Sequence, residues 1–206
     1  MKEHPNPLKF RADDIQAFDG SQAIRMRPQL YFEECYQLKS LNPLILEMCC
    51  HAFDEFFDNH CTKIAIQLNR ESIDINYDAG MNLHPSTQPS KTIAECLFTV
   101  LYACSNLKKH LAVGQQHCKV GIYTVNAITE WCKLTTISNG QKGQFEFQQE
   151  SIIHRKLTTS SEIEQTRIHF KIDQAIFPNF KYDTEGLQTL VNALPKDLAS
   201  LRISIN

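Results

Sequence analysis

The segment 43–58 carries the side chains whose types and spacing best suit chemistry. Its acidic and imidazole residues recur at intervals of three and four, so they share one face of a helix: Glu47, His51, Asp54, Glu55 and Asp58. A carboxylate within hydrogen-bond reach of a water molecule can accept its proton, so this face offers groups suited to acid–base chemistry. The same spacing is also typical of the solvated face of an amphipathic helix, and taken alone it favours that plainer interpretation.

Cysteine and histidine gather at the two ends of this segment, as Cys49-Cys50-His51 and as His60-Cys61. Thiolate and imidazole are ligands that soft metal ions prefer. However, Cys49 falls on the apolar face of the expected helix, and Cys50 beside it does not easily converge with His60. We therefore predict no metal site. No Cys-x-x-Cys pair occurs either, so we expect all eight cysteines to be reduced, buried thiols rather than a disulfide framework.

Length and charge exclude several classes of function. The chain has 206 residues, which is enough for one domain with a buried core. Lys plus Arg is 21 and Asp plus Glu is 23, so there is no basic excess for autonomous DNA binding. No apolar run reaches the roughly 18 residues that span a bilayer. The first residues contain no apolar signal core, so we expect a cytoplasmic protein.

Apolar periodicity along the chain predicts the elements that position these residues. Residues 1–10 hold Pro-Asn-Pro and are expected to form an extended arm. We predict helices over 21–27, 43–58, 92–107, 120–130 and 183–194, and strands over 63–68, 72–77, 131–138, 143–149, 165–173 and 201–205. This mixed order predicts an α+β fold, a two-layer α/β sandwich, rather than a doubly wound sheet.

Several stretches of the sequence occur in the order found in a known family. They are Phe18 to Tyr31, Leu46-Glu47, Asp54-Glu55, His60-Cys61, Ala94-Glu95, Thr99 to Ala103, Val120 to Ile122, Val125 to Ala127, and Gln165 to Phe170. Together they cover nearly the whole chain. The chain thereby resembles the ATPase domain of the DNA gyrase B and topoisomerase IV B family, of the GHKL (Bergerat-fold) superfamily. The resemblance implies a mixed sheet with helices on one face.

The resemblance implies a role for each matching residue near the first long helix. Glu47 matches the glutamate that activates the attacking water. His51 replaces an asparagine that ligates Mg²⁺, and imidazole serves that oxygen-preferring ion poorly. In Asp78-Ala-Gly80, the aspartate and glycine match the start of an adenine-reading motif. The strand pattern leaves a second register open, in which Tyr77 takes the place of that aspartate.

The phosphate-binding part of the pattern is less complete. The chain holds 7 glycines in all, and the family uses several here so that backbone N–H groups can approach phosphates closely. Gly121 is retained, whereas Gln116 and Lys119 stand where glycines are expected. Thr166 matches a threonine that supports the aspartate and adenine.

Two functions follow from this pattern of matches and departures. The first is a pseudo-ATPase with lost or weak ATP binding and little or no hydrolysis, acting through protein–protein interaction. The second is a module that binds ATP or ADP through His51, Asp78, Gly80, Gly121 and Thr166 and hydrolyses ATP slowly. The changes at Gln116 and Lys119 argue against a third possibility, an ordinary ATPase.

The resemblance also bears on domains and partners. It implies one ATPase-like domain over 11–206, without the transducer and DNA-cleavage domains of the family. Self-association through the N-terminal arm, or binding to a protein partner such as a topoisomerase subunit, is the expected mode of action. No membrane association is expected.

Overall fold

The computed structural model describes residues 19–86, 90–101, 103 and 118–206. The predicted arm over 1–10 and the end of the helix predicted over 92–107 lie outside these residues, as does Gln116. The described elements are, in chain order, α1 Gly20–Met26, α2 Pro28–Tyr31, α3 Glu33–Leu38, α4 Asn42–Met48, α5 Cys50–Phe57, β1 Lys63–Leu68, β2 Ile73–Tyr77, α6 Ile93–Thr99, α9 Gly121–Asn126, β3 Thr129–Ser138, β4 Gln141–Gln148, β5 Ser151–Thr159, β6 Gln165–Ile172, α10 Thr184–Asn192, the 3-10 helix η2 Lys196–Leu198 and β7 Arg202–Ile205.

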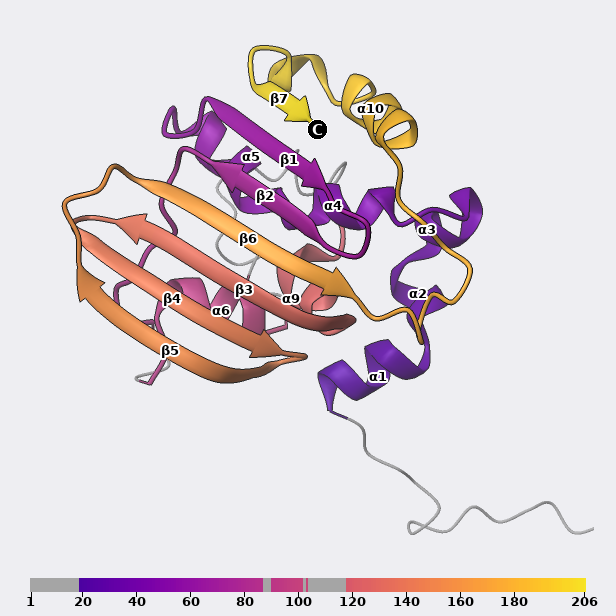
Figure 1. The fold of residues 1–206 in the computed structure, drawn as a ribbon, viewed down its shortest axis with the longest axis horizontal. Helices are drawn as coiled ribbons and strands as arrows, with labels where there is room; N and C mark the ends of the chain where they lie inside the picture. Colours follow the sequence, from indigo (N-terminus) through magenta and orange to yellow (C-terminus); the bar gives the residue numbers. More distant parts are fainter. Residues whose placement is uncertain (1–18, 87–89, 102, 104–117) are drawn as a thin grey trace, which may run out of the picture.

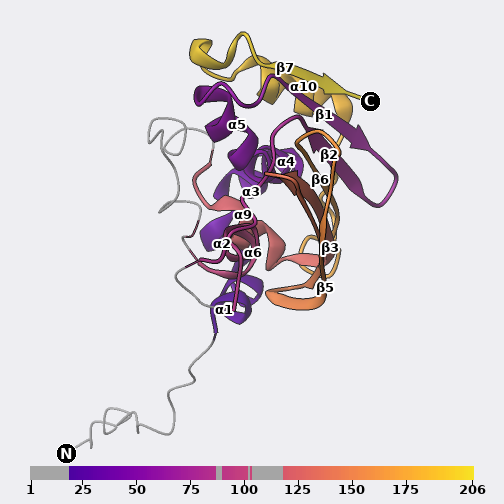
Figure 2. The ribbon, with the colours of Figure 1, turned by 90° about the vertical axis from the view of Figure 1, so that its left-hand side faces the viewer.

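The strands form one sheet in the order β5-β4-β3-β6-β2-β1-β7 (Figure 1). β1 and β7 are parallel, and every other neighbouring pair is antiparallel. Helices α1 to α6 and α9 lie on one side of the sheet (Figure 2). This arrangement confirms the predicted α+β sandwich with a mixed sheet.

Alternation along the strands sends apolar side chains into the layer between sheet and helices. In the β1–β2 hairpin, Ile66 lies opposite Ile75, and both are completely buried. Each such side chain contributes about 1.5–3 kcal/mol through burial. The hairpin predicted from this alternation is confirmed.

Several elements differ from the prediction. α2, α3 and η2 were not predicted, and the helix predicted over 92–107 ends at Thr99, because Val100 has an extended backbone. The helix predicted over 43–58 is divided at Cys49, whose backbone (ψ 0°) separates α4 from α5. The helix predicted over 120–130 ends at Asn126, because β3 begins at Thr129. β5 was not predicted, since nearly every residue of Ser151–Thr159 is exposed and the strand has no buried alternation to detect.

Asn126 lies in Val125 to Ala127, one of the stretches that match the family in sequence, and its contacts give it a structural role. Its side-chain amide donates hydrogen bonds to the backbone oxygens of Phe98 and Gln149, at 2.9 and 2.6 Å. It thereby joins α6 to the turn between β4 and β5, which is a structural role. None of the helices in the described part of the chain is long and apolar enough to cross a membrane.

Candidate functional site

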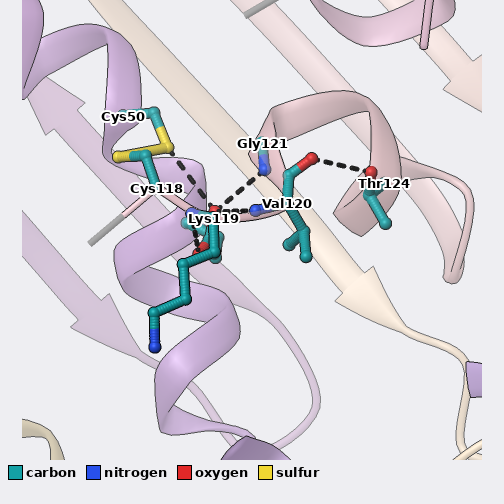
Figure 3. Close-up of a disulfide and its surroundings, with 7 residues drawn as sticks. Cys50, Cys118, Lys119, Val120, Gly121 and Thr124 are labelled. Atoms are coloured by element: carbon teal, nitrogen blue, oxygen red, sulfur yellow. Dashed lines mark hydrogen bonds between the residues drawn. A yellow bond between two sulfur atoms is a disulfide. The ribbon is translucent and has the colours of Figure 1, made fainter. Parts of the chain in front are cut away.

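Glu47, near the end of α4, is almost completely buried at 8% exposure. Its carboxylate accepts hydrogen bonds from the backbone N–H groups of Lys119 (2.8 Å), Val120 (3.2 Å) and Gly121 (2.9 Å). These three donors lead into α9, and Figure 3 shows the nitrogens of Val120 and Gly121 directed to the same point. Such bonds to a carboxylate are stronger than those between neutral groups.

Gly121 makes this arrangement possible through its backbone. Its φ of +80° lies in the region that residues with a side chain rarely adopt. The glycine retained in the sequence is therefore required by the turn that presents its N–H to Glu47. The structure thus brings together two of the predicted site residues, Glu47 and Gly121.

Cys50 and Cys118 form a disulfide beside this carboxylate (Figure 3). The bond joins the first residue of α5 to the residue before Lys119, with Cα atoms 5.6 Å apart and a sequence separation of 68. The expectation that all eight cysteines are reduced is therefore wrong for this pair. No sequence spacing links them, because only the fold brings the two segments together. The five other cysteines within the described ranges are buried thiols, as predicted: Cys35, Cys49, Cys61, Cys96 and Cys132. Cys104 lies outside those ranges.

His51 and Tyr77 meet between α5 and the sheet. The Tyr77 hydroxyl lies 3.1 Å from Nδ1 of His51, within hydrogen-bond distance. Burial raises the pKa of Tyr77 well above its usual value, and a hydrogen bond with Thr166 acts in the opposite direction. Thr166 lies directly opposite Tyr77 in the β2–β6 pairing. His51, Tyr77 and Thr166 therefore form a second group.

Thr166 also fixes the chain after β2. Its hydroxyl donates to the backbone oxygen of Ala79 at 2.7 Å and lies 2.8 Å from the hydroxyl of Thr136. Thr136 in turn accepts from the backbone N–H of Met81 at 2.7 Å. These bonds hold residues 79–81 against β3 and β6.

Asp78 and Gly80 lie apart from these groups. The Asp78 carboxylate accepts hydrogen bonds from the backbone N–H groups of Thr62 (2.8 Å) and Lys63 (3.0 Å), on the opposite side of the strand from Tyr77. A Cβ at Gly80 would stand 2.2 Å from the backbone oxygen of Ile137, so this glycine permits close packing on β3. Of the two registers considered for this strand, the structure has the one in which Tyr77 faces the helices.

Lys119 contributes its backbone to the site but not its side chain. Its ammonium lies 3.9 Å from a carboxylate oxygen of Glu34, and both side chains are largely exposed. Among the described residues, a different group, Glu55, Asp58 and His60, has oxygen and nitrogen atoms within 4.8 Å of one another. His60 and Glu55 in this group are also joined by a 2.8 Å hydrogen bond.

No family model matches the chain. Among curated proteins it is similar to the DNA gyrase B protein of Synechocystis, with 28% identity over 204 residues, covering 95% of this chain and 19% of that protein. It is also similar to the type 2 topoisomerase B protein of Aquifex aeolicus, with 26% identity, covering 85% of this chain and 23% of that protein. The chain thus spans about a fifth of the length of these relatives.

A solved structure agrees with these relatives. The 43K ATPase domain of Thermus thermophilus gyrase B, in complex with an aminocoumarin, superposes with a TM-score of 0.70 at 21% identity, covering 91% of this chain and 48% of that one. The chain is a distant homologue of the gyrase B ATPase domain. The family resemblance in the sequence is therefore confirmed, and so is the Bergerat fold.

The structure brings the predicted site residues together in two groups. Glu47 and Gly121 meet near the α4–α5 junction. His51 contacts Tyr77, and Thr166 on β6 lies opposite Tyr77. Sequence alternation (Ile73, Ile75, Tyr77) was the signal for Tyr77, whereas nothing in the sequence singled out Cys118.

Proposed function

We propose that this chain is a degenerate gyrase B-type module, a pseudo-ATPase that binds nucleotide weakly or not at all, hydrolyses little or none, and acts through protein–protein contact. The single observation that carries the proposal is the position of the Glu47 carboxylate. It accepts three backbone hydrogen bonds, from Lys119, Val120 and Gly121.

These hydrogen bonds oppose catalysis by Glu47. A general base needs an oxygen lone pair directed at the water whose proton it removes. Here the oxygens of Glu47 are used by N–H donors, and releasing them leaves a buried carboxylate with fewer partners, at a cost of about 1–3 kcal/mol. Glu47 therefore stabilises the turn before α9 rather than activating water.

The residues for Mg²⁺ and adenine do not fit either. Mg²⁺ prefers oxygen ligands in octahedral geometry, whereas His51 offers a ring nitrogen that already contacts Tyr77. A buried phenol at Tyr77 replaces an aspartate that would accept a hydrogen bond from the adenine amino group. Its ring also takes up more space than a carboxylate. Both changes oppose binding of a nucleotide together with its Mg²⁺ ion.

A second candidate, weak binding of ATP or ADP with slow hydrolysis, is favoured by the retained residues. Glu47, Gly121 and Thr166 keep their types, and Thr166 keeps its place opposite Tyr77 on the neighbouring strand. If ligand anions displaced Glu47 from its donors, the same N–H groups would become available. Asp78 and Gly80 lie apart from Glu47. In either case Asp78 accepts a hydrogen bond from Lys63 at the start of β1, and Gly80 permits close packing on β3.

The expected partners follow from the relatives and the charge. The similar proteins are subunits of type 2 topoisomerases, so a topoisomerase subunit or a second copy of this chain is the proposed partner. Autonomous DNA binding is not proposed, because Lys plus Arg (21) does not exceed Asp plus Glu (23). A cytoplasmic location and a single ATPase-like domain over 11–206, with residues 1–10 as an arm, complete the proposal.

Calorimetric titration with a non-hydrolysable ATP analogue, with and without Mg²⁺, tests the nucleotide part directly. We expect no heat, or a dissociation constant that Mg²⁺ leaves unchanged, and no phosphate release above buffer. An aminocoumarin serves as a second probe of the same region. Phosphate release that Glu47→Gln abolishes while Glu71→Gln leaves it intact would contradict the proposal, because Glu71 is an exposed residue outside the site.

A further inference from the structure

The disulfide and the hydrogen bonds of Glu47 join the same two segments, the α4–α5 junction and residues 118–121. Cys50 lies three residues after Glu47, and its sulfur is 3.7 Å from a carboxylate oxygen of Glu47. Cys118 directly precedes Lys119, the first of the N–H donors. We propose that Cys50 and Cys118 form a reversible redox site, and that their oxidation locks Glu47 onto its backbone donors while their reduction releases it to admit an anionic ligand.

Four of the described cysteines outside the pair are unsuited to this chemistry. Burial is the main cause that raises the pKa of Cys35 and Cys61 to about 12, and burial also raises the pKa of Cys49 and Cys132. Because the thiolate is the reacting form, these residues stay inert near neutral pH. Within the described part of the chain this disulfide stands among cysteines that are otherwise thiols, a pattern typical of redox-sensing rather than of a disulfide-stabilised scaffold.

The bond acts on the site through a short path. With the disulfide formed, residues 118–121 are fixed to the α4–α5 junction by a covalent link as well as by hydrogen bonds. An anion that takes over the N–H groups of Val120 and Gly121 must then move Glu47 without moving Cys118. After reduction the covalent link is gone, while the hydrogen bonds to the charged carboxylate remain. A ligand anion can compete with Glu47 for the same N–H donors.

A dithiol can supply the electrons and protons that reduce the disulfide between Cys50 and Cys118. One thiolate of the dithiol attacks a sulfur of the pair and forms a mixed disulfide, and its second thiol closes a cyclic disulfide. Two electrons and two protons pass to Cys50 and Cys118, which become thiols while the dithiol is oxidised. Hydrogen peroxide reverses the change, since two thiols and one peroxide give the disulfide and two waters.

The test compares oxidised and reduced protein in two measurements. Thiols are first counted by mass after alkylation with N-ethylmaleimide, and reduction is followed to completion because both cysteines are 2% exposed. Amide hydrogen exchange is then measured at Lys119, Val120 and Gly121. Titration with a non-hydrolysable ATP analogue, whose choice rests on the proposed function, follows on the same samples.

We expect reduction to speed exchange at these amides by tenfold or more and to strengthen binding of the analogue by at least tenfold. The Cys50→Ser/Cys118→Ser variant should behave like reduced protein with or without dithiol. Cys96→Ser is the matched control, because Cys96 is another buried thiol, and this variant should keep the full response to dithiol.

The outcomes separate the redox site from the nucleotide function. Faster exchange without any binding supports the redox site and counts against nucleotide as the ligand. Binding that is equal in both states, with unchanged exchange, overturns the redox site and supports the second candidate function, weak binding of nucleotide. Failure of peroxide to remove the two thiols also overturns the redox site.

Discussion

At the residue scale, Glu47 is defined by its contacts with the backbone. Its buried carboxylate accepts hydrogen bonds from the N–H groups of Lys119, Val120 and Gly121. Those contacts make Glu47 a structural residue at the junction of α4 and α9. Its removal is therefore expected to affect folding before it affects catalysis.

We predict that Glu47→Gln lowers the free energy of unfolding by about 1–3 kcal/mol. The amide keeps one oxygen acceptor but places an NH₂ group against backbone donors, so at least one buried N–H loses its partner. Urea denaturation followed by circular dichroism measures the effect. Glu71→Gln is the control, because its ion pair with Lys171 is exposed and is worth less than about 1 kcal/mol. Equal midpoints for the two variants would refute the prediction.

The sequence singled out Glu47, Gly121 and Thr166 by type and order, and their role in a nucleotide site stays a prediction. The direction of Asp78 could not be predicted in this way, because a shift of one residue along a strand moves a side chain to the opposite face. Ile73 and Ile75 indicated the register that the structure has, with Tyr77 facing the helices.

At the scale of elements, the division between α4 and α5 matters most for the site. Continuous apolar spacing predicted one helix over 43–58, and no proline or glycine marks a break at Cys49. The break follows instead from tertiary packing, since Glu47 before it and Cys50 after it both contact residues 118–121. The local sequence of 43–58 does not indicate contacts with residues so far along the chain.

The ends of β1 and β2 give an element-scale prediction about pH. Burial by itself raises the pKa of Asp78, but hydrogen bonds from Thr62 and Lys63 outweigh it and lower the pKa to about 2 from a usual value of 3.8. A lowered pKa in the folded state means that Asp78 stabilises the protein above about pH 4, and that this contribution is lost as the pH falls to about 2.

As the pH falls from 4 to 2, the Asp78→Asn variant should therefore lose less of its free energy of unfolding than the wild type does. The measurement is the urea midpoint of wild type and variant across that range. The two curves are expected to converge at the acid end, because protonated Asp78 and asparagine are then alike in charge. Asp197→Asn, at an exposed position in η2, should follow wild type throughout. A constant offset between wild type and Asp78→Asn at every pH would count against the hydrogen-bonded carboxylate as the cause.

At the scale of the whole molecule, the fold was predictable because its signal is distributed over many positions. Short matches from Phe18 to Phe170 agreed in order with one family, and no single departure could cancel them. Function depends on a few residues at one site, so overall similarity is weaker evidence for function than for fold. The same 28% identity therefore supports the fold strongly and the activity weakly.

The disulfide gives a prediction for the whole chain that does not depend on any ligand. Cys50 and Cys118 close a loop with a sequence separation of 68, and such a cross-link typically adds about 2–4 kcal/mol by restricting the unfolded chain. For a protein of this size, 1 kcal/mol shifts the melting temperature by about 2–4 °C, so complete reduction should lower it by roughly 5–15 °C. Differential scanning calorimetry with and without a dithiol measures the shift. The Cys50→Ser/Cys118→Ser variant should melt at one temperature in both conditions. If that variant responded to dithiol as wild type does, the stabilisation would have to come from another pair of cysteines.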